Sequence, residues 1–203
     1  MKKNKISKNW INKQKRDLYV RKSKIDGYRS RAAYKLEEID QKFNLLKNNI
    51  KIIDLGSAPG SWSQYITKKI KYCKTVSIDL KDVEKIKNVT HIIGDFTDTN
   101  NQTRIMKEVG PKVDIVLSDM AVNTTGNKNV DSIQTGDLCL QAMLFSKDIL
   151  NINGKFVSKI FMGSSFNEIV KSARLYFKKV KVFKPKSSRK DSKENFIICE
   201  NLR

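Results

Sequence analysis

The sequence predicts an α/β fold in which helices cover both faces of a mostly parallel β-sheet. Short apolar runs of strand length alternate along the chain with longer segments of helical periodicity, and this alternation is typical of parallel sheets. A glycine-rich turn separates the first apolar run, residues 51–55, from a helical segment. Since 203 residues suit a single domain, we expect one domain over residues 30–203, preceded by a basic arm over residues 1–29.

The first predicted helix follows Ser30, which we expect to cap it. Ala32, Leu36, Ile39 and Phe43 recur at spacings of four, three and four residues, so they would share one face. Further helices are predicted over residues 62–70, about 132–150 and about 165–177. The predicted strands comprise residues 51–55, 75–79, 91–93, 113–117, 155–160, 180–183 and 196–199.

The positive charge of the chain is concentrated in two segments. The formal net charge is +20, of which residues 1–35 contribute +11 and residues 171–193 contribute +9, so the rest of the chain is neutral. A general bias toward lysine would charge the middle of the chain as well. Two basic flanks beside a neutral body therefore predict a polyanionic partner, and nucleic acid is the partner that we expect.

Several classes of protein find no support in the sequence. No apolar run reaches the roughly eighteen residues of a membrane helix, and no apolar segment follows the charged N-terminus as in a secretory signal. Cys73, Cys139 and Cys199 are far apart and His91 is the only histidine, so neither a disulfide framework nor a metal site is expected. These features predict a cytoplasmic protein.

The most distinctive local motif is DLGSAPGSW at residues 54–62, between a predicted strand and a helix. Its glycines allow a tight turn and the close approach of a ligand, and ligands of parallel sheets bind beyond the carboxyl ends of the strands. The motif is not G-x-G-x-x-G, which disfavours a nicotinamide-dependent oxidoreductase. It suits a small zwitterion such as the methionine part of S-adenosylmethionine, whose carboxylate would be bound by helix N-terminal amides.

Acidic residues follow the next two predicted strands. Asp79 could accept hydrogen bonds from both hydroxyls of a ribose. Asp95 could accept one from an adenine amino group, with Phe96 beside the ring. Each acid alone could equally be a turn or capping residue. In this order after the glycine loop, the three elements predict an S-adenosylmethionine site.

A second set of residues predicts the chemistry. Asp119 follows the strand 113–117, and Lys159 ends the strand 155–160. The Asn/Asp-Pro-Pro-Tyr/Phe motif of amino-group methyltransferases is absent, and no cysteine follows a proline as in RNA C5-methyltransferases. A ribose 2′-hydroxyl is a weak acid that needs a base or charge stabilisation, which lysine can supply. Lys35 and Glu194 could complete such a site, although a solvated surface position would explain either of them.

Together these motifs resemble the FtsJ-type family of RNA ribose methyltransferases, particularly its bacterial members that act on large-subunit ribosomal RNA. The resemblance runs from about Trp10 to Arg203. It rests on YRSRAAYKL at 28–36, the glycine loop, LSDMA at 117–121, GKFVSK at 154–159, and KPKSSR at 184–189 followed by SKE at 192–194. It implies a Rossmann-like methyltransferase fold with a seven-stranded, mostly parallel sheet whose last strand is antiparallel.

The resemblance also implies roles for individual residues. The family's catalytic set maps onto Lys35, Asp119, Lys159 and Glu194. Lys159 would accept the proton, Asp119 and Lys35 would tune and orient it, and Glu194 would have a smaller role. The implied contacts of S-adenosylmethionine are Gly60, Trp62, Asp79, Asp95 and Asp119.

The implied substrate is a uridine of 23S ribosomal RNA within the 50S subunit, methylated by a monomeric enzyme during ribosome biogenesis. Two other functions stay open: 2′-O-methylation of a tRNA anticodon loop, and a non-catalytic RNA-binding assembly factor. The chain departs from the family at Ser61, where many relatives have glycine, at Val122, where proline is usual, and at Phe196, where tyrosine is common. These departures concern substrate detail rather than the type of reaction.

The two basic flanks have a role under this hypothesis. Lysines and arginines of residues 2–31 and 171–190 would hold RNA phosphates, while base or shape contacts select the target. Several phosphate contacts would make RNA binding steeply dependent on salt.

Overall fold

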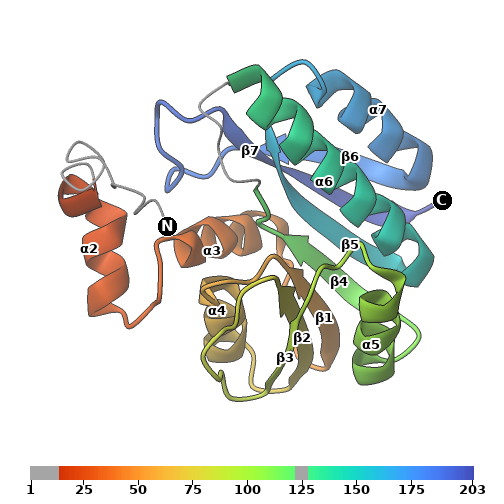
Figure 1. Cartoon of the computed structure of the whole chain (residues 1–203), viewed down its shortest axis with the longest axis horizontal. Coiled ribbons are helices and arrows are strands. Elements are labelled where there is room, and N and C mark those ends of the chain that lie inside the picture. Colours follow the sequence, from red (N-terminus) through yellow and green to blue (C-terminus); the bar gives the residue numbers. More distant parts are fainter. Residues whose placement is uncertain (1–13, 122–127) are drawn as a thin grey trace, which may run out of the picture.

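The structure is a computed structural model that describes residues 14–121 and 128–203. Within these residues the chain forms a seven-stranded sheet in the order β3-β2-β1-β4-β5-β7-β6 (Figure 1). The strands are β1 (Ile50–Leu55), β2 (Cys73–Asp79), β3 (Val89–Ile93), β4 (Val113–Ser118), β5 (Leu150–Phe161), β6 (Phe177–Phe183) and β7 (Glu194–Leu202). The helices are α2 (Leu18–Ile25), α3 (Ala32–Phe43), α4 (Ser61–Lys69), α5 (Thr99–Val109), α6 (Lys128–Ile149) and α7 (Phe166–Tyr176).

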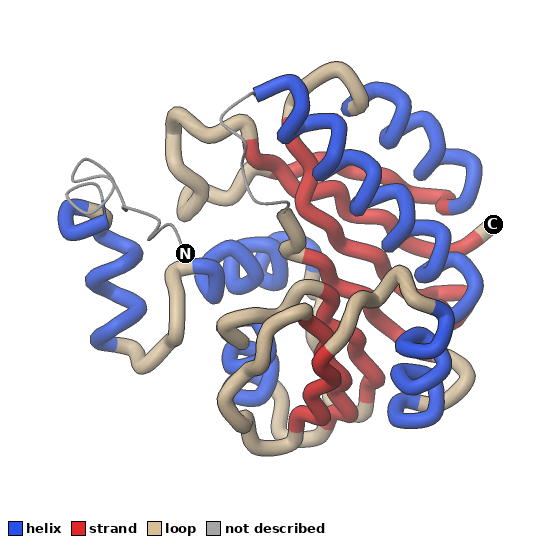
Figure 2. The backbone as a smooth tube through the Cα atoms, in the orientation of Figure 1, coloured by secondary structure: helices blue, strands red, loops and turns tan. Residues whose placement is uncertain are grey.

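The directions of the strands confirm the predicted α/β fold. Strands β1 to β5 run parallel to one another. Strand β7 is antiparallel to both of its neighbours, β5 and β6. Helices lie on both faces of this sheet (Figure 2). The mostly parallel sheet with an antiparallel last strand is therefore the one that the family resemblance implies.

Two hydrophobic cores lie on opposite faces of the sheet. Helices α3 and α4 pack on one face, where Leu36 is fully buried against Ile52 of β1 and its neighbours. Helices α5, α6 and α7 pack on the other face, where Ile105 belongs to the same core as Ile53. Ile52 and Ile53 enter different cores because successive side chains of a strand alternate between faces. Burial on both faces explains why the strands are continuous apolar runs in the sequence.

The helix predicted after Ser30 is α3, and its buried face includes the predicted Leu36 and Ile39. The residue at its N-cap is Arg31 rather than Ser30. The hydroxyl of Ser30 still accepts a hydrogen bond from the Ala32 amide at 3.2 Å. It also bonds to the Ser61 hydroxyl at 2.8 Å, so Ser30 joins the beginnings of α3 and α4.

Two helices were not predicted from the sequence. Helix α2 lies within the segment expected to be a basic arm, and the Asp17 carboxylate accepts hydrogen bonds from two amides of its first turn. Helix α5 begins after Asp98, whose carboxylate caps it in the same way. Helix α2 is short and polar, so its apolar periodicity is weak, whereas α5 buries Ile105 and Val109 on one face. The capping aspartates are the signal that could have revealed both helices.

The order of the strands creates a crevice at one edge of the sheet. From β1 the chain proceeds outward through β2 and β3, and then returns to place β4 on the other side of β1. In sheets of this kind, ligands bind beyond the carboxyl ends of the strands where the order reverses. The turn at residues 56–60 and the residues after β4 meet at this point.

The position of Val122 and the expected absence of a membrane helix were both considered in the sequence. Val122, one of the departures from the family pattern, lies outside the described residues. Within residues 14–121 and 128–203, none of the helices combines the length and the apolar character needed to cross a bilayer.

Candidate active site

The turn at residues 56–60 joins β1 to α4 at the edge of the sheet. Gly56 has a φ of 71°, a conformation that favours glycine. A Cβ atom at Gly56 would lie 2.2 Å from Cγ of Met120, so glycine lets this turn pack against the residues after β4. The amides of Gly56 and Ser57 both donate to the carbonyl of Ile78, at 2.9 and 3.2 Å. The turn is thus fixed against both of the neighbouring strand ends.

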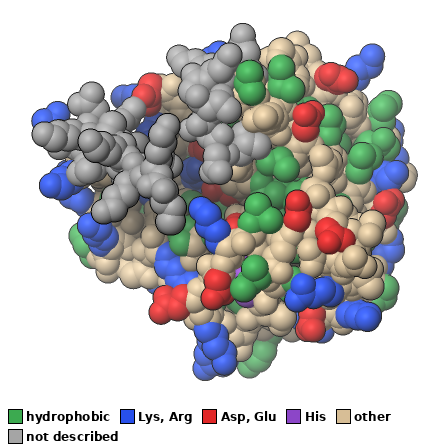
Figure 3. Space-filling view, in the orientation of Figure 1, with side chains coloured by type: hydrophobic (Ala, Val, Ile, Leu, Met, Phe, Trp, Pro, Cys, Tyr) green, Lys and Arg blue, Asp and Glu red, His purple; other side chains and the backbone are tan. Residues whose placement is uncertain are grey.

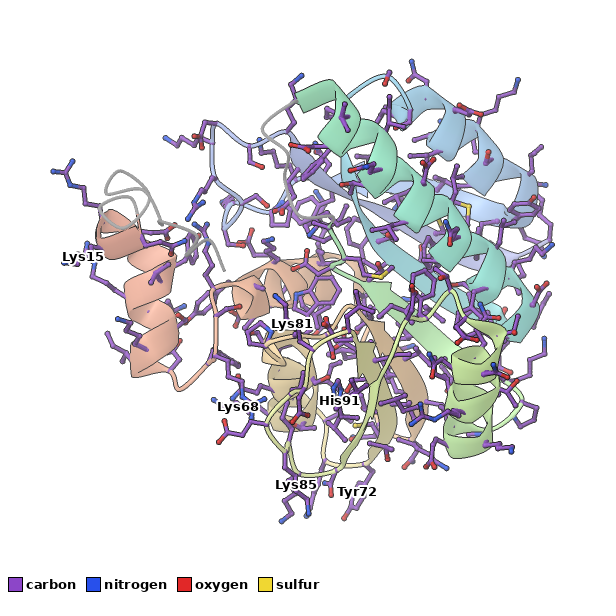
Figure 4. The ribbon with its side chains drawn as sticks, in the orientation of Figure 1. Lys15, Lys68, Tyr72, Lys81, Lys85 and His91 are labelled. Carbon is purple, nitrogen blue, oxygen red and sulfur yellow. The ribbon has the colours of Figure 1, made fainter. Side chains whose placement is uncertain are left out.

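A cleft of about 660 Å³, which we call the cofactor cleft, opens at this edge. Lys81, which lines this cleft, is labelled near the middle of Figure 4, and Lys85, which does not line it, is labelled near the bottom. Apolar side chains from Leu80, Phe96 and Met120 alternate with acidic ones in the lining. The whole lining is Gly56, Ala58, Ile78, Asp79, Leu80, Lys81, Gly94, Asp95, Phe96, Thr97, Asp119, Met120, Ala121, Leu138 and Gln141. Such a mixed surface suits a ligand with a flat apolar ring and several polar groups.

Asp79 and Asp95, the acids predicted to contact the cofactor, both line the cleft. Asp79 accepts a hydrogen bond from the amide of Ala58 with Oδ2 and from that of Lys81 with Oδ1, both at 2.9 Å. Oδ1 of Asp95 accepts from the amide and the hydroxyl of Thr97 at 2.9 and 2.8 Å. Both acids therefore organise turns, as the sequence left open. A carboxylate has about four lone-pair directions, so each also has capacity to accept from a ligand.

Two other predicted cofactor residues do not line the cofactor cleft. Gly60 has a φ of 102°, and a Cβ atom there would lie 2.8 Å from Nη1 of Arg29. The buried indole of Trp62 donates to the carbonyl of Ala32 at 2.8 Å and packs against Phe196 with ring centroids 5.8 Å apart. The side chain of Trp62 thus faces the core between α3 and α4, whereas Gly60 packs against Arg29, Val83 and Ile86. Either residue could contact a ligand only through its main chain.

The residues of the cofactor cleft fit S-adenosylmethionine. The hydroxyl of Ser57 in the turn is buried and has no hydrogen-bond partner among the described residues, and a buried hydroxyl of this kind needs a partner. Asp79, Asp95 and Asp119 bring carboxylates to the lining, which favours a ligand that carries positive charge.

The four residues predicted to be catalytic converge into one chain of ion pairs beside the cleft. Nζ of Lys35 lies 2.7 Å from Oε2 of Glu194 and 3.6 Å from Oδ2 of Asp119. Nζ of Lys159 lies 3.0 Å from Oδ1 of Asp119 and donates to its main-chain carbonyl at 2.6 Å. Each of the four side chains is at most 15% exposed. We call this arrangement, Glu194–Lys35–Asp119–Lys159, the catalytic chain.

The order of the strands explains how distant residues meet. Asp119 directly follows β4, Lys159 is near the end of β5, and Glu194 begins β7. These three strands are neighbours in the sheet, and the antiparallel direction of β7 brings its beginning to the end of β5. Lys35 reaches the same place from α3. The catalytic chain therefore depends on the antiparallel last strand.

Lys35 and Asp119, at the centre of the catalytic chain, stabilise each other's charges. Burial opposes a charge on Lys35, but the carboxylates of Asp119 and Glu194 outweigh it and raise the pKa of Lys35 above its usual value. Burial also opposes a charge on Asp119, but the ammonium groups of Lys159 and Lys35 lower its pKa. At neutral pH, Lys35 is therefore a cation and Asp119 is an anion.

Lys159 has the surroundings expected of a group that can accept a proton. Among residues 14–121 and 128–203, the oxygen partners of its Nζ are Oδ1 and the main-chain oxygen of Asp119. A neutral amine has two N–H bonds for these oxygens and keeps one lone pair. Lys35 differs because it lies between two carboxylates. Lys159 is thus held from the side of Asp119 alone, whereas Lys35 is held as a cation between two carboxylates.

Sequence reasoning missed the residues that hold Glu194. The hydroxyl of Ser188 donates to Oε1 of Glu194 at 2.7 Å. The carboxylate of Glu38 accepts the amides of Lys186 and Ser187 at 2.6 and 2.8 Å, which fixes this segment on α3. The KPKSSR motif was the available signal, although it did not reveal this role. Of the cofactor-cleft lining, sequence reasoning also missed Lys81, Met120, Leu138 and Gln141.

A further carboxylate lies under the turn. Asp54 is buried at the end of β1, and the hydroxyl of Ser63 donates to its Oδ2 at 2.7 Å. Burial raises the pKa of Asp54 to about 7, against the opposing effect of this hydrogen bond. Asp54 and Asp119 are thus two buried aspartates with opposite pKa shifts, because only Asp119 pairs with lysines.

Residues 14–121 and 128–203 contain no group of three or more His, Cys, Asp or Glu side chains suited to a metal ion. Cys73, Cys139 and Cys199 are free thiols, and burial raises the pKa of Cys139 to about 12.

Comparison with known proteins identifies relatives across almost the whole chain. Residues 28–202 match the family described as FtsJ-like methyltransferase. A protein of Pelagibacter ubique (strain HTCC1062), named Ribosomal RNA large subunit methyltransferase E, is 64% identical over the full length of both sequences. A Rickettsia akari (strain Hartford) protein of the same name is 46% identical over 96% of this chain and 88% of its own length.

Solved structures share the fold. A Plasmodium falciparum protein assigned as a ribosomal RNA methyltransferase aligns with a TM-score of 0.77 and 36% identity, over 86% of this chain and 98% of that one. Human Methyltransferase-like protein 13, solved in complex with SAH, aligns with a TM-score of 0.58 and 13% identity, over 84% of this chain and 79% of that one. The second likeness concerns the fold alone.

Proposed function

The chain belongs to the FtsJ-like methyltransferase family, and on this premise we propose that it is a ribosomal RNA methyltransferase that uses S-adenosylmethionine to methylate a ribose 2′-hydroxyl. The proposed target is a uridine of 23S ribosomal RNA within the 50S subunit. The observation that carries the proposal is the catalytic chain, in which Lys159 and Lys35 lie on either side of the carboxylate of Asp119. Asp119 belongs both to this chain and to the lining of the cofactor cleft.

Residues of the cofactor cleft would hold the cofactor. Asp79 would accept hydrogen bonds from the ribose hydroxyls, and Asp95 from the adenine amino group with Phe96 beside the ring. The turn at residues 56–60 and the first amides of α4 would bind the methionine part. When bound, S-adenosylmethionine supplies a methyl group on a sulfonium sulfur, which keeps the electron pair of the broken carbon–sulfur bond when an oxygen takes the methyl.

Lys159 is the proposed general base. In its neutral form, Nζ would accept the proton of the 2′-hydroxyl while it still donates to the carbonyl of Asp119, with Oδ1 of the same residue 3.0 Å away. Proton removal raises the electron density on the ribose oxygen at the moment it attacks. The new ammonium charge on Lys159 would then lie beside the carboxylate of Asp119, which stabilises it.

The other three residues would support this step. Lys35, held as a cation, stabilises negative charge that develops on the ribose oxygen. Asp119 keeps both lysines in place from one side, and Glu194 holds Lys35 from the other. Glu194 touches neither Lys159 nor the cofactor-cleft lining in the described residues, which is consistent with the smaller role proposed for it.

The choice of ribosomal RNA rests on the relatives and on charge. The relatives' name specifies large-subunit ribosomal RNA. Figure 3 shows Lys and Arg side chains gathered on the side of the molecule that carries α2, which suits an RNA backbone. We further propose that the protein acts as a monomer in the cytoplasm during ribosome biogenesis.

The test is methyl transfer from labelled S-adenosylmethionine to 50S subunits reconstituted with unmethylated 23S RNA, and to unmodified tRNA in parallel. We expect 2′-O-methyluridine in the 50S sample alone, mapped by nuclease digestion and mass spectrometry. Label in tRNA alone would move the substrate to the anticodon loop. Binding of both S-adenosylmethionine and 50S subunits without any transfer would support a non-catalytic assembly factor instead.

A further inference from the structure

His91, the only histidine of the chain, belongs to β3 and does not itself line the cofactor cleft. Its ring makes two polar contacts. Nδ1 lies 3.0 Å from the hydroxyl of Ser77 on β2, and Nε2 lies 3.2 Å from the main-chain carbonyl of Lys81. Figure 4 labels His91 and Lys81 in the part of the molecule that carries β2 and β3. His91 therefore connects the sheet to the segment after β2, whose first residues line the cleft.

The two partners determine which ring nitrogen carries the proton in the neutral form of His91. A main-chain carbonyl can only accept a hydrogen bond, so Nε2 must donate to Lys81. Nδ1 then accepts from the hydroxyl of Ser77. Ser77 is buried and is opposite His91 in the register of β2 and β3. The sheet thus holds the ring at one nitrogen and directs the other nitrogen at Lys81.

Lys81 is the residue through which His91 reaches the cofactor cleft. The amide of Lys81 donates to Oδ1 of Asp79 at 2.9 Å, while its carbonyl accepts from His91. Oδ2 of Asp79 accepts from the amide of Ala58. A carboxylate with an amide at each oxygen has a fixed orientation, whereas one held at a single oxygen can rotate about its Cβ–Cγ bond. The orientation of Asp79 therefore depends on the position of Lys81.

Packing contributes little to the position of this segment. Residues 80–82 are all exposed, and the first buried residue after them is Val83. A cavity of about 460 Å³ lies between residues 82–86 and the strands β2 and β3, with His91 in its wall. Hydrogen bonds therefore fix the segment more than apolar contacts do, and His91 supplies one of them.

We infer that His91 is a positioning residue of the cofactor site. It acts through Lys81 to hold the carboxylate of Asp79 in the orientation that accepts the ribose hydroxyls of S-adenosylmethionine. This inference rests on the proposed function, in which Asp79 binds that ribose. His91 controls the affinity for the cofactor and leaves proton transfer at Lys159 unchanged.

Two amide side chains separate the two contacts of His91. The amide of Gln extends about as far as Nε2, so His91→Gln can still donate to the carbonyl of Lys81. The amide of Asn extends only about as far as Nδ1, so His91→Asn can bond to Ser77 but does not reach Lys81. Both side chains are polar and uncharged, so their comparison isolates the contact with Lys81. Thr90→Val, at the neighbouring exposed position of β3, is the control for a substitution in this edge strand.

Titration calorimetry without RNA measures the Kd for S-adenosylmethionine, and thermal melting of the cofactor-free protein checks the fold. Loss of one neutral hydrogen bond in His91→Asn should raise the Kd about threefold to tenfold. His91→Gln and Thr90→Val should stay within about twofold of the parent. In methyl transfer to 50S subunits, KM for the cofactor should follow the Kd, while kcat at saturating cofactor stays within about twofold.

A double-mutant cycle tests the route through Asp79. If His91 acts by orienting this carboxylate, His91→Asn should change the Kd by less than about twofold in a protein that already carries Asp79→Ala. Independent contributions would instead multiply the two increases in Kd. A general loss of stability would act in both backgrounds, so the cycle distinguishes positioning from a merely structural role.

Three results would overturn the inference: a parental Kd for His91→Asn, an equal rise for His91→Asn and His91→Gln, or increases that multiply in the cycle. If His91→Asn does not fold, His91→Phe repeats the comparison, because its ring keeps the shape and forms neither hydrogen bond. A parent that binds S-adenosylmethionine but transfers no methyl group would refute the proposed function, whereas the Kd values would still decide the role of His91.

Discussion

In the cofactor cleft, acidic side chains bond to nearby backbone amides, whereas in the catalytic chain side chains bond to one another across the fold. Asp95 accepts from a residue two positions away, and Asp79 from one two positions away and one in the preceding turn. Lys35 and Glu194 are 159 positions apart in sequence. Short motifs therefore specify the first region, whereas the order of strands in the sheet specifies the second.

The two regions should also respond differently to substitution. Each acid of the cofactor cleft orders a turn and would bind one part of the cofactor. Its loss should therefore weaken cofactor binding only by the free energy of a few hydrogen bonds. In the catalytic chain, charges that are almost excluded from water depend on one another, and loss of one member leaves its partner buried and uncompensated. Kinetic effects should therefore be larger in the catalytic chain.

The largest expected effect is that of Lys159→Ala. Removal of the proposed base should lower kcat by about a hundredfold to ten-thousandfold. Affinity for S-adenosylmethionine should stay within about twofold, because Lys159 is not part of the cofactor-cleft lining. Single-turnover methyl transfer to 50S subunits measures the first quantity, and titration calorimetry with the cofactor measures the second.

Lys178→Ala is the matched control for this substitution, since the lysine is exposed on β6. It should leave both quantities unchanged. A Lys159→Ala protein that lost cofactor affinity as strongly as turnover would break the distinction between the two regions. Near-normal turnover would remove Lys159 from the role of base.

The sequence predicted the two regions unequally well. The turn at residues 56–60, Asp79 and Asp95 are signals that lie next to the strands they follow. All four members of the catalytic chain were named, but Lys35 and Glu194 were supported by family resemblance rather than by local chemistry. Pairing of Glu194 with Lys35 requires that β7 run antiparallel beside β5, which no local pattern contains.

Three features of the structure were not predicted from the sequence, and each has its own physical reason. Helices α2 and α5 both follow a capping aspartate, a signal that the sequence analysis did not use. The contact of Ser188 with Glu194 depends on how the segment 184–193 folds back over α3. The ring of Trp62 is buried in the core beside α3, where apolar area is removed from water, so the cofactor contact predicted for this residue would come from its main chain.

The next effect concerns Asp54 and Asp119, whose pKa values shift in opposite directions. Burial raises the pKa of Asp54 to about 7 in the folded protein, from its ordinary value of 3.8. Between about pH 4 and 7 the unfolded chain has released this proton while the folded protein keeps it. Stability should therefore fall as pH rises through this window, by at most about 4 kcal/mol.

The substitution Asp54→Asn should remove that part of the pH dependence. The amide oxygen of Asn can still accept the hydrogen bond from Ser63, so the fold is expected to persist. Urea unfolding of the cofactor-free protein at pH 4.5, 6 and 8 measures the effect. Because the pKa of Asp119 is lowered, Asp119 becomes protonated only below about pH 4, and stability falls as it does so. The pH windows in which Asp54 and Asp119 affect stability are therefore different. An unchanged pH profile in the variant would show that Asp54 is not the titrating group.

The smallest expected effect is that of Asp79→Ala in the cofactor cleft. A hydrogen bond to a charged group contributes about 1.5 to 3 kcal/mol, so the Kd for S-adenosylmethionine should rise about tenfold to a hundredfold. With saturating cofactor, kcat should stay within a few-fold of the parent, because Asp79 does not contact the catalytic chain in the described residues. Asp82→Ala, at an exposed position outside the cleft, controls for charge. A kcat loss equal to that of Lys159→Ala would mean that the turn also positions the catalytic residues, and that the two regions act as one unit joined through Gly56 and Met120.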